Sequence, residues 1–154
     1  MSYIRFSKTL IALTLFGTTL ATSTVAQAAD ALKATISAYP DTHAKVRGHV
    51  AAKFNSGYVT IRYNLTGLTP NANGGLHIHA GTSCKTAKEV GGHYFAPKDQ
   101  GDYWKNANWV SDSKGHAKGS FRLLSGLDRK DNLHHAVVVH DSHGDRIGCG
   151  ILQG

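Results

Sequence analysis

The strongest constraint on the fold is a two-residue alternation of apolar and polar side chains, which recurs in short segments along most of the chain. Side chains that alternate in this way point to opposite faces of a β-strand, and no segment shows the 3.6-residue period of a helix. We expect such strands at 31–39, 46–54, 58–65, around 76–80 and at 116–124, a strand rich in β-branched residues at 133–140, and a last strand at 146–152. Short strands separated by turn residues predict an all-β sandwich or barrel in one domain, without internal repeats.

Residues 1–28 have the composition of a secretory signal peptide. Two basic residues form a charged start, residues 10–21 form an apolar run, and Ala26-Gln27-Ala28 fits the small-x-small cleavage pattern. The apolar run is too short to span a bilayer comfortably. We therefore expect an exported protein, periplasmic or secreted, with a mature domain at 29–154 and no stable membrane insertion after cleavage.

The mature part keeps 15 basic and 10 acidic residues, a net charge of +5, because two of the 17 basic residues belong to the signal. The charge is scattered and no basic run carries interleaved aromatic residues, so we expect no nucleic-acid partner. A positive field favours a small anionic substrate. Two cysteines, Cys84 and Cys149, favour a single disulfide in an oxidising compartment. Ten histidines in so short a chain point to a metal.

The pattern His77-Ile78-His79 is the first candidate for metal binding. On a strand, residues two apart share a face at about 7 Å, close enough for two imidazoles to tilt onto one ion. Leu76, Ile78 and Ala80 would then face the core. Two exposed histidines on a surface strand would produce the same pattern, so the interpretation depends on further ligands.

Two further histidines complete a candidate set. His93 follows two glycines inside residues 83–108, a long loop without a strand or helix period, and loops of this length are usually functional. His140 ends the apolar run Ala136-Val137-Val138-Val139, where a polar residue would lie at a barrel rim. An all-imidazole site made of His77, His79, His93 and His140 suits copper, zinc, iron or nickel.

These residues resemble the copper/zinc superoxide dismutase family across essentially the whole mature region. The matching blocks are NLTGLTPNANGGLHIH, Cys84, GGHYFAP, SDSKGHA, AVVVHD and RIGCGIL, in the order and spacing of the family. The resemblance implies an eight-stranded Greek-key β-barrel with a long metal-bearing loop and a dismutase that converts superoxide to oxygen and hydrogen peroxide. It further implies that the copper ligands are His77, His79, His93 and His140.

The same resemblance assigns two other features. It implies that Cys84 and Cys149 form the intrasubunit disulfide, and that Arg146, three residues before Cys149, receives superoxide beside the copper. His93 would be the imidazole that bridges copper and zinc in the family, with a catalytic role alongside Arg146. Alternatively, Arg146 has only a structural role, as an arginine at the end of a strand that pairs with Asp141 or Asp145.

The chain departs from the family at the zinc site. Between His93 and Asp112 it has no histidine, and only Asp99 and Asp102 are acidic. Zinc requires a closed tetrahedral set of ligands. Only residues 141–145 separate His140 from Arg146, where the family has a long charged loop. We therefore expect the copper-only branch of the family, with one copper per chain, no zinc and an open copper site.

Several questions stay open from the sequence. Asp99, Asp102 or Asp141 could orient His93 in place of zinc. There are two alternatives to an enzyme. One is a protein that buffers or delivers copper, and the other is a structural domain of the same fold. We favour a monomer. We expect the remaining histidines of the mature chain to be exposed, namely His43, His49, His116, His134, His135 and His143.

Overall fold

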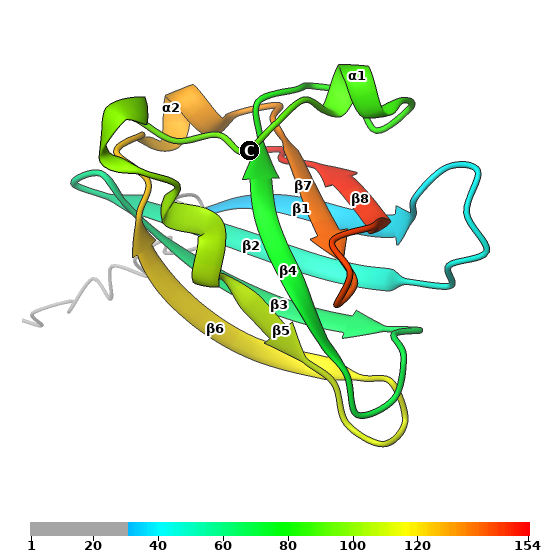
Figure 1. The fold of residues 1–154 in the computed structure, drawn as a ribbon. Helices are drawn as coiled ribbons and strands as arrows, with labels where there is room; N and C mark the ends of the chain where they lie inside the picture. Colours follow the sequence, from blue (N-terminus) through cyan, green and yellow to red (C-terminus); the bar gives the residue numbers. More distant parts are fainter. Residues whose placement is uncertain (1–30) are drawn as a thin grey trace, which may run out of the picture.

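Eight antiparallel strands form a single sheet that curls into a nearly closed barrel (Figure 1). The structure is a computed structural model and describes residues 31–154. The predicted signal peptide at 1–28 lies outside the described residues. The strands are β1 (Ala31–Ala38), β2 (Arg47–Asn55), β3 (Tyr58–Thr66), β4 (Asn73–His79), β5 (Asn108–Val110), β6 (Ala117–Leu124), β7 (Ala136–His140) and β8 (Arg146–Ile151).

The order of strands in the sheet is β5-β4-β7-β8-β1-β2-β3-β6, so neighbours in space are often distant in sequence. Strand β4 pairs with β7, and β3 pairs with β6, which requires the long connections typical of a Greek-key barrel. The hairpin β2–β3 keeps a continuous register from Arg47↔Thr66 to Asn55↔Tyr58. The all-β, eight-stranded barrel expected from the sequence is confirmed.

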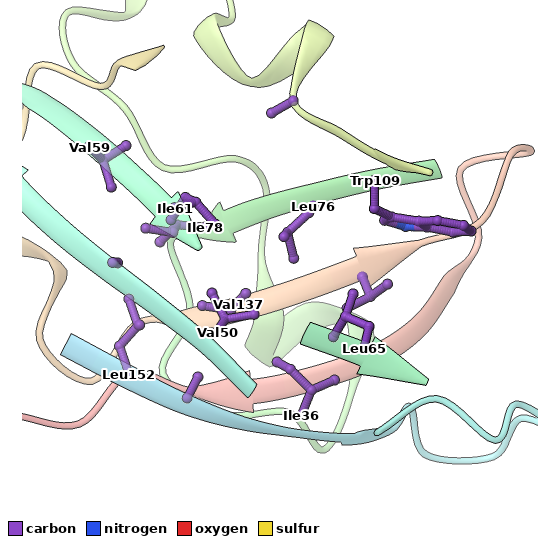
Figure 2. Packing of buried hydrophobic residues seen from close by; sticks show 14 of the residues in the cluster. Ile36, Val50, Val59, Ile61, Leu65, Leu76, Ile78, Trp109, Val137 and Leu152 are labelled. Carbon is purple, nitrogen blue, oxygen red and sulfur yellow. The ribbon is translucent and has the colours of Figure 1, made fainter. Parts of the chain in front are cut away.

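The inward side chains of the strands form the hydrophobic core (Figure 2). Leu76 and Ile78 of β4 face this core with Ile61 of β3 and Val137 of β7, and each is at most 1% exposed. The alternation on β4 therefore turns the histidines at its odd positions away from the core. The prediction for Ala80 is wrong, because it follows the end of the strand and is exposed.

The long loop contains three short helical turns: α1 (Ala87–Val90), η2 (Lys98–Gln100) and η3 (Tyr103–Asn106). Side-chain caps begin two of them, since Thr86 accepts from the N–H of Glu89 and Asp102 accepts from the N–H of Trp104. Trp104 is fully buried and its indole N–H donates to the Tyr94 carbonyl at 2.8 Å. This anchor attaches the loop to the barrel.

Two strands differ from the sequence-based expectation. Strand β5 was not expected, and β7 begins at Ala136 rather than at residue 133, because α2 (Arg129–Asn132) ends immediately before that point. A capping box at Asp128 and Asp131 stabilises α2. None of the helices among residues 31–154 has the length and apolar character needed to cross a membrane.

Candidate metal centre

The four predicted histidines come together at one place on the barrel. One ligand nitrogen from each of His77, His79, His93 and His140 lies within 4.8 Å of the others. Among the histidine, cysteine and carboxylate side chains of residues 31–154, these four histidines form the one group arranged to hold a metal ion. The side chains of His79 and His140 are buried, and those of His77 and His93 are half-buried.

Pairing on both sides of β4 explains why the four side chains meet. On one side β4 pairs with β7 from Leu76↔Val139 to His79↔Ala136, which brings the end of β7 and His140 alongside His77. On the other side the loop residue His93 forms a bridge with His79, and the N–H of Tyr94 donates to the Ile78 carbonyl at 2.9 Å. Strand β4 therefore supplies two ligands and positions the other two.

The rings of His79 and His140 are oriented by backbone carbonyls. Nδ1 of His79 lies 2.9 Å from the Gly91 carbonyl, and Nδ1 of His140 lies 2.9 Å from the Gly144 carbonyl. Each Nδ1 therefore carries the proton, and in neutral rings both Nε2 atoms are acceptors. These two Nε2 atoms are only 3.1 Å apart. Two lone pairs at this distance repel each other unless they share a cation, so the arrangement fits a bound metal ion.

His77 has a different orientation. Its Nδ1 is buried and has no hydrogen-bond partner, whereas the ring edge with Cε1 and Nε2 rests against Gly75. A Cβ at position 75 would lie 2.5 Å from Cε1 and 2.6 Å from Nε2 of His77. An unsatisfied buried nitrogen is costly in a protein interior, and a metal ion would satisfy it. Gly75 was missed by the sequence analysis, because a glycine two residues before a histidine is not a distinctive signal.

Asp102 is the carboxylate that orients His93. Its Oδ2 lies 2.6 Å from Nδ1 of His93, and its Oδ1 accepts from the N–H of Trp104 at 2.9 Å. Partial burial raises the pKa of Asp102, but the hydrogen bonds from His93 and Trp104 outweigh this effect, so the pKa is below its usual value. The carboxylate is thus ionised at neutral pH and fixes the ring with Nε2 available.

The surroundings keep the clustered imidazoles neutral. Burial lowers the pKa of His77 to about 3 and that of His79 to about 4, and repulsion among the clustered rings adds to the effect. The pKa of His140 is lowered as well, again first by burial. A metal ion binds the neutral imidazole, so these rings are ready for coordination without losing a proton at neutral pH.

Arg146 lies beside the cluster at the start of β8, where it pairs with His140. Its guanidinium donates to the Gly91 carbonyl at 3.0 Å and to the Ala87 carbonyl at 3.4 Å. The Gly91 carbonyl also binds His79, so one backbone oxygen positions both side chains. Among the described ion pairs none joins Arg146 to Asp141 or Asp145, the partners of the structural alternative.

A hollow of about 660 Å³ beside Arg146 is lined by His140 and also by His43 and Asp145. Two more hollows open onto the histidines. One, of about 510 Å³, is lined by His79, His93, His140 and Arg146 and also by Lys98. The other, of about 370 Å³, is lined by His77, His93 and His140 and also by Lys105. Lys98 donates to the His93 carbonyl at 2.7 Å, and Lys105 is exposed. The cluster is therefore accessible to a small molecule, and the two hollows are bordered by Lys98 and Lys105 as well as by the carboxylates of Asp102 and Asp141.

A disulfide joins Cys84 in the long loop to Cys149 in β8. It links residues 65 positions apart and holds the loop that carries Gly91 and His93 against the strand that begins with Arg146. The pairing agrees with the expectation from the sequence. The disulfide thus joins the two chain segments that flank the histidine cluster.

The remaining histidines are not part of the cluster, although His43 lines a hollow together with His140. His43, His49, His116, His134 and His143 are exposed, as expected. The expectation for His135 is wrong: it is half-buried, and its ring stacks on Tyr94 with centroids 4.1 Å apart. Its Nδ1 is buried without a partner. An aromatic residue in the long loop thus covers a histidine that the sequence places at a strand end.

The comparisons with known proteins agree with this geometry. A curated relative, the superoxide dismutase [Cu-Zn] of Humicola lutea, is 32% identical over 100 residues, which are 56% of this chain. The chain spans about 63% of the length of that relative. A crystal structure of the clock protein EA4 matches with a TM-score of 0.60 over 80% of this chain and 94% of that chain. At 19% sequence identity, this second match indicates the fold alone.

A family model described as copper/zinc superoxide dismutase (SODC) matches residues 46–152. This range includes strands β2 to β8 and the whole histidine cluster. The chain therefore belongs to the copper/zinc superoxide dismutase family.

Proposed function

We propose that this protein is an exported superoxide dismutase with one copper ion per chain and no zinc site. The observation that carries the proposal is the convergence of four imidazoles, three with Nδ1 held by a carbonyl or carboxylate, beside the guanidinium of Arg146. Copper, when bound, supplies the one-electron couple that dismutation requires and that zinc lacks. Nε2 of His79, His93 and His140 and Nδ1 of His77 would hold it.

The chain's own residues would bind the substrate and supply a proton. Arg146 holds its guanidinium at the hollow that reaches His79 and His140, where a charge-assisted hydrogen bond would retain a small anion. His93 would carry a proton at Nε2 whenever that nitrogen is free of copper, and Asp102 at Nδ1 would stabilise the resulting imidazolium. Two superoxide anions and two protons give one oxygen and one hydrogen peroxide, so a residue that delivers protons is required.

The contacts of His93 support the copper-only assignment. In a copper/zinc site the second nitrogen of this ring would bind zinc, but here Nδ1 is engaged by Asp102. The second oxygen of Asp102 is occupied by the N–H of Trp104. No further histidine, cysteine or carboxylate joins this pair to make a second group of metal ligands in the described part of the chain.

The signal-like residues 1–28 and the disulfide support export. A disulfide persists in an oxidising compartment such as the periplasm or the extracellular space, and it is rare in the cytosol. This part of the proposal predicts that the signal is removed before Ala29 in the exported protein. Sequencing of the mature N-terminus tests it.

The decisive experiment measures metal content and superoxide consumption together. The mature chain, residues 29–154, is loaded with copper, with zinc or with both, dialysed, and analysed by elemental mass spectrometry and pulse radiolysis. We expect one copper, no stoichiometric zinc, and activity that depends on copper. His77→Ala and His140→Ala should each lose copper and activity, whereas the matched surface variant His49→Ala should keep both.

The alternative outcomes discriminate among the functions. Copper bound at one per chain without superoxide consumption would favour a copper-buffering or copper-delivery protein. One tightly held zinc beside copper would refute the copper-only assignment. Full activity in His77→Ala would show that the histidine cluster is not the active site.

A further inference from the structure

The outer face of strands β1, β2, β3 and β6 carries a concentration of positive charge. We call it the cationic face and define it by its outward basic side chains, all of which are exposed: Lys33, Arg47, Lys53, Arg62, Lys118 and Arg122. Every acidic residue of the described chain lies in a loop or a short helix instead. Within residues 31–154, none of the strands that form this face carries a carboxylate, although the net charge of the chain is only moderate.

The strand register brings three of these cations around one depression. Lys33 of β1 and Arg62 of β3 flank Ala51 of β2 in one row of the sheet, and Lys118 of β6 pairs with Asn64 in the next row. Adjacent strands are about 4.8 Å apart and rows on one face are about 7 Å apart, so the three charges lie within reach of one ligand.

The depression has a volume of about 670 Å³ and is lined by these three cations. Thr35, His49, Asn64 and Gln153 also line it, while most of the exposed surface inside the depression is apolar. Lys33, Arg62 and Lys118 take part in none of the ion pairs found within residues 31–154. Unpaired cations next to hydroxyl and amide groups provide charge-assisted bonds to anions together with hydrogen bonds to neutral polar groups.

We infer that the cationic face binds an acidic polysaccharide, a chain that presents carboxylate or sulfate groups among many hydroxyls. Arginine and lysine pair with those anions, and the threonine and amide side chains match the hydroxyls. The inference is independent of the proposed function. The histidine cluster is built on β4, β7 and the long loop, outside β1, β2, β3 and β6, so bound polysaccharide would leave it open (Figure 1).

Two other anionic partners fit the face less well. A single-stranded nucleic acid needs exposed aromatic rings for stacking. Tyr63 also lines the depression, but it packs against the core beside Phe121. Tyr58 is 37% exposed, but the Arg122 guanidinium covers one face of its ring at 3.7 Å from the centroid. A membrane surface favours apolar side chains that enter the bilayer, whereas the exposed side chains that define this face are lysines and arginines.

The test compares two triple variants of the mature, copper-loaded chain that have the same net charge. The face variant carries Lys33→Gln, Arg62→Gln and Lys118→Gln, and the control variant carries Lys85→Gln, Lys88→Gln and Lys114→Gln on exposed loop and α1 positions. Binding to the carboxylated polysaccharide alginate is measured by calorimetry over a salt series. Thermal melting and superoxide consumption of each variant establish that fold and active site are intact.

We expect the unmodified chain and the control variant to bind alginate with affinities within a few-fold, and the face variant to bind about tenfold or more weakly with a shallower salt dependence. Equal affinities of the two variants would overturn the inference, as would an absence of alginate binding by the unmodified chain. Oligothymidine and phosphatidylglycerol vesicles are the competing probes. Tighter binding of either one than of alginate would assign the face to nucleic acid or membrane and overturn the inference.

Discussion

Asp102 and His93 form a closely coupled pair, with 2.6 Å between the carboxylate Oδ2 and the ring Nδ1. We predict that Asp102→Asn lowers copper affinity about 10- to 100-fold, because partners that orient a metal-binding histidine have effects of this size. Competition with a copper chelator measures the change. Asp99→Asn, in the same loop but without a contact to the ring, is the matched control and should behave like the unmodified chain. Equal affinities of the two variants would contradict the role of Asp102.

A methyl group at position 75 should displace a copper ligand without unfolding the barrel. The Cβ of Gly75→Ala would meet the His77 ring at 2.5–2.6 Å, and a side-chain ring can move where a backbone cannot. We predict weaker copper binding with a nearly unchanged melting temperature of the metal-free protein. Gly92→Ala is the control, because a Cβ there meets nothing within 4 Å. Normal copper affinity in Gly75→Ala would show that His77 does not need its present position.

Removal of the disulfide should destabilise the whole domain. The bridge joins residues 65 positions apart, and a closed loop of that length stabilises the folded state by about 4 kcal/mol in the chain-entropy model. Cys84→Ser should therefore lower the urea midpoint, and reduction of the unmodified chain should lower it similarly. An unchanged midpoint in both experiments would show that the loop is held by its other contacts, such as Trp104.

Arg146→Glu should slow superoxide consumption far more than it changes copper content. Reversing the charge at the hollow removes the anion contact and repels the substrate, so we predict a loss of about tenfold or more. Exposed charges are screened over about 8–10 Å at physiological salt, so the rate of the unmodified chain should also fall with ionic strength. Lys114→Glu is the control for net charge. Equal rates and salt slopes in the three fully copper-loaded proteins would exclude Arg146 as the guide.

The metal-free protein should lose stability as the pH falls below about 6.5, the usual pKa of histidine. His77 and His79 have folded-state pKa values of about 3 and about 4, so between these values and 6.5 the unfolded chain binds more protons than the folded one. Stability then decreases with falling pH in that window. Melting curves from pH 7.5 to 5 measure the slope. His79→Gln should flatten it and His49→Gln should not, and a slope insensitive to His79→Gln would contradict the assignment.

The alternation along the long strands predicted an all-β sandwich or barrel, and the resemblance to the family predicted the eight-stranded Greek-key barrel. The sequence analysis missed β5, since three residues, Asn108 to Val110, are too few to show a period, although Trp109 within it is buried and donates to the His140 carbonyl. The short helical turns were also missed, because they depend on single caps such as Thr86 and Asp102 rather than on a repeated pattern.

The four candidate ligands could be found because they stand in recognisable sequence blocks, and the structure brings them together. The partner of His93 could not be chosen from Asp99, Asp102 and Asp141, since the path of a loop without a period depends on tertiary contacts. Here the burial of Trp104 fixes that path and places Asp102 next to the ring. The same kind of contact, with Tyr94, explains the error at His135.

The separation between the core and the histidines on β4 has a consequence for maturation. Leu76 and Ile78 pack inward (Figure 2), whereas His77 and His79 lie on the other face of the strand. The hydrophobic driving force for folding therefore acts on the opposite side of the strand from the ion. In small zinc-dependent domains, by contrast, the ion replaces a missing core and folding waits for it. We therefore expect this barrel to fold without metal and to bind its ion afterwards. The copper supply would then limit the activity of the protein but not the amount of folded protein.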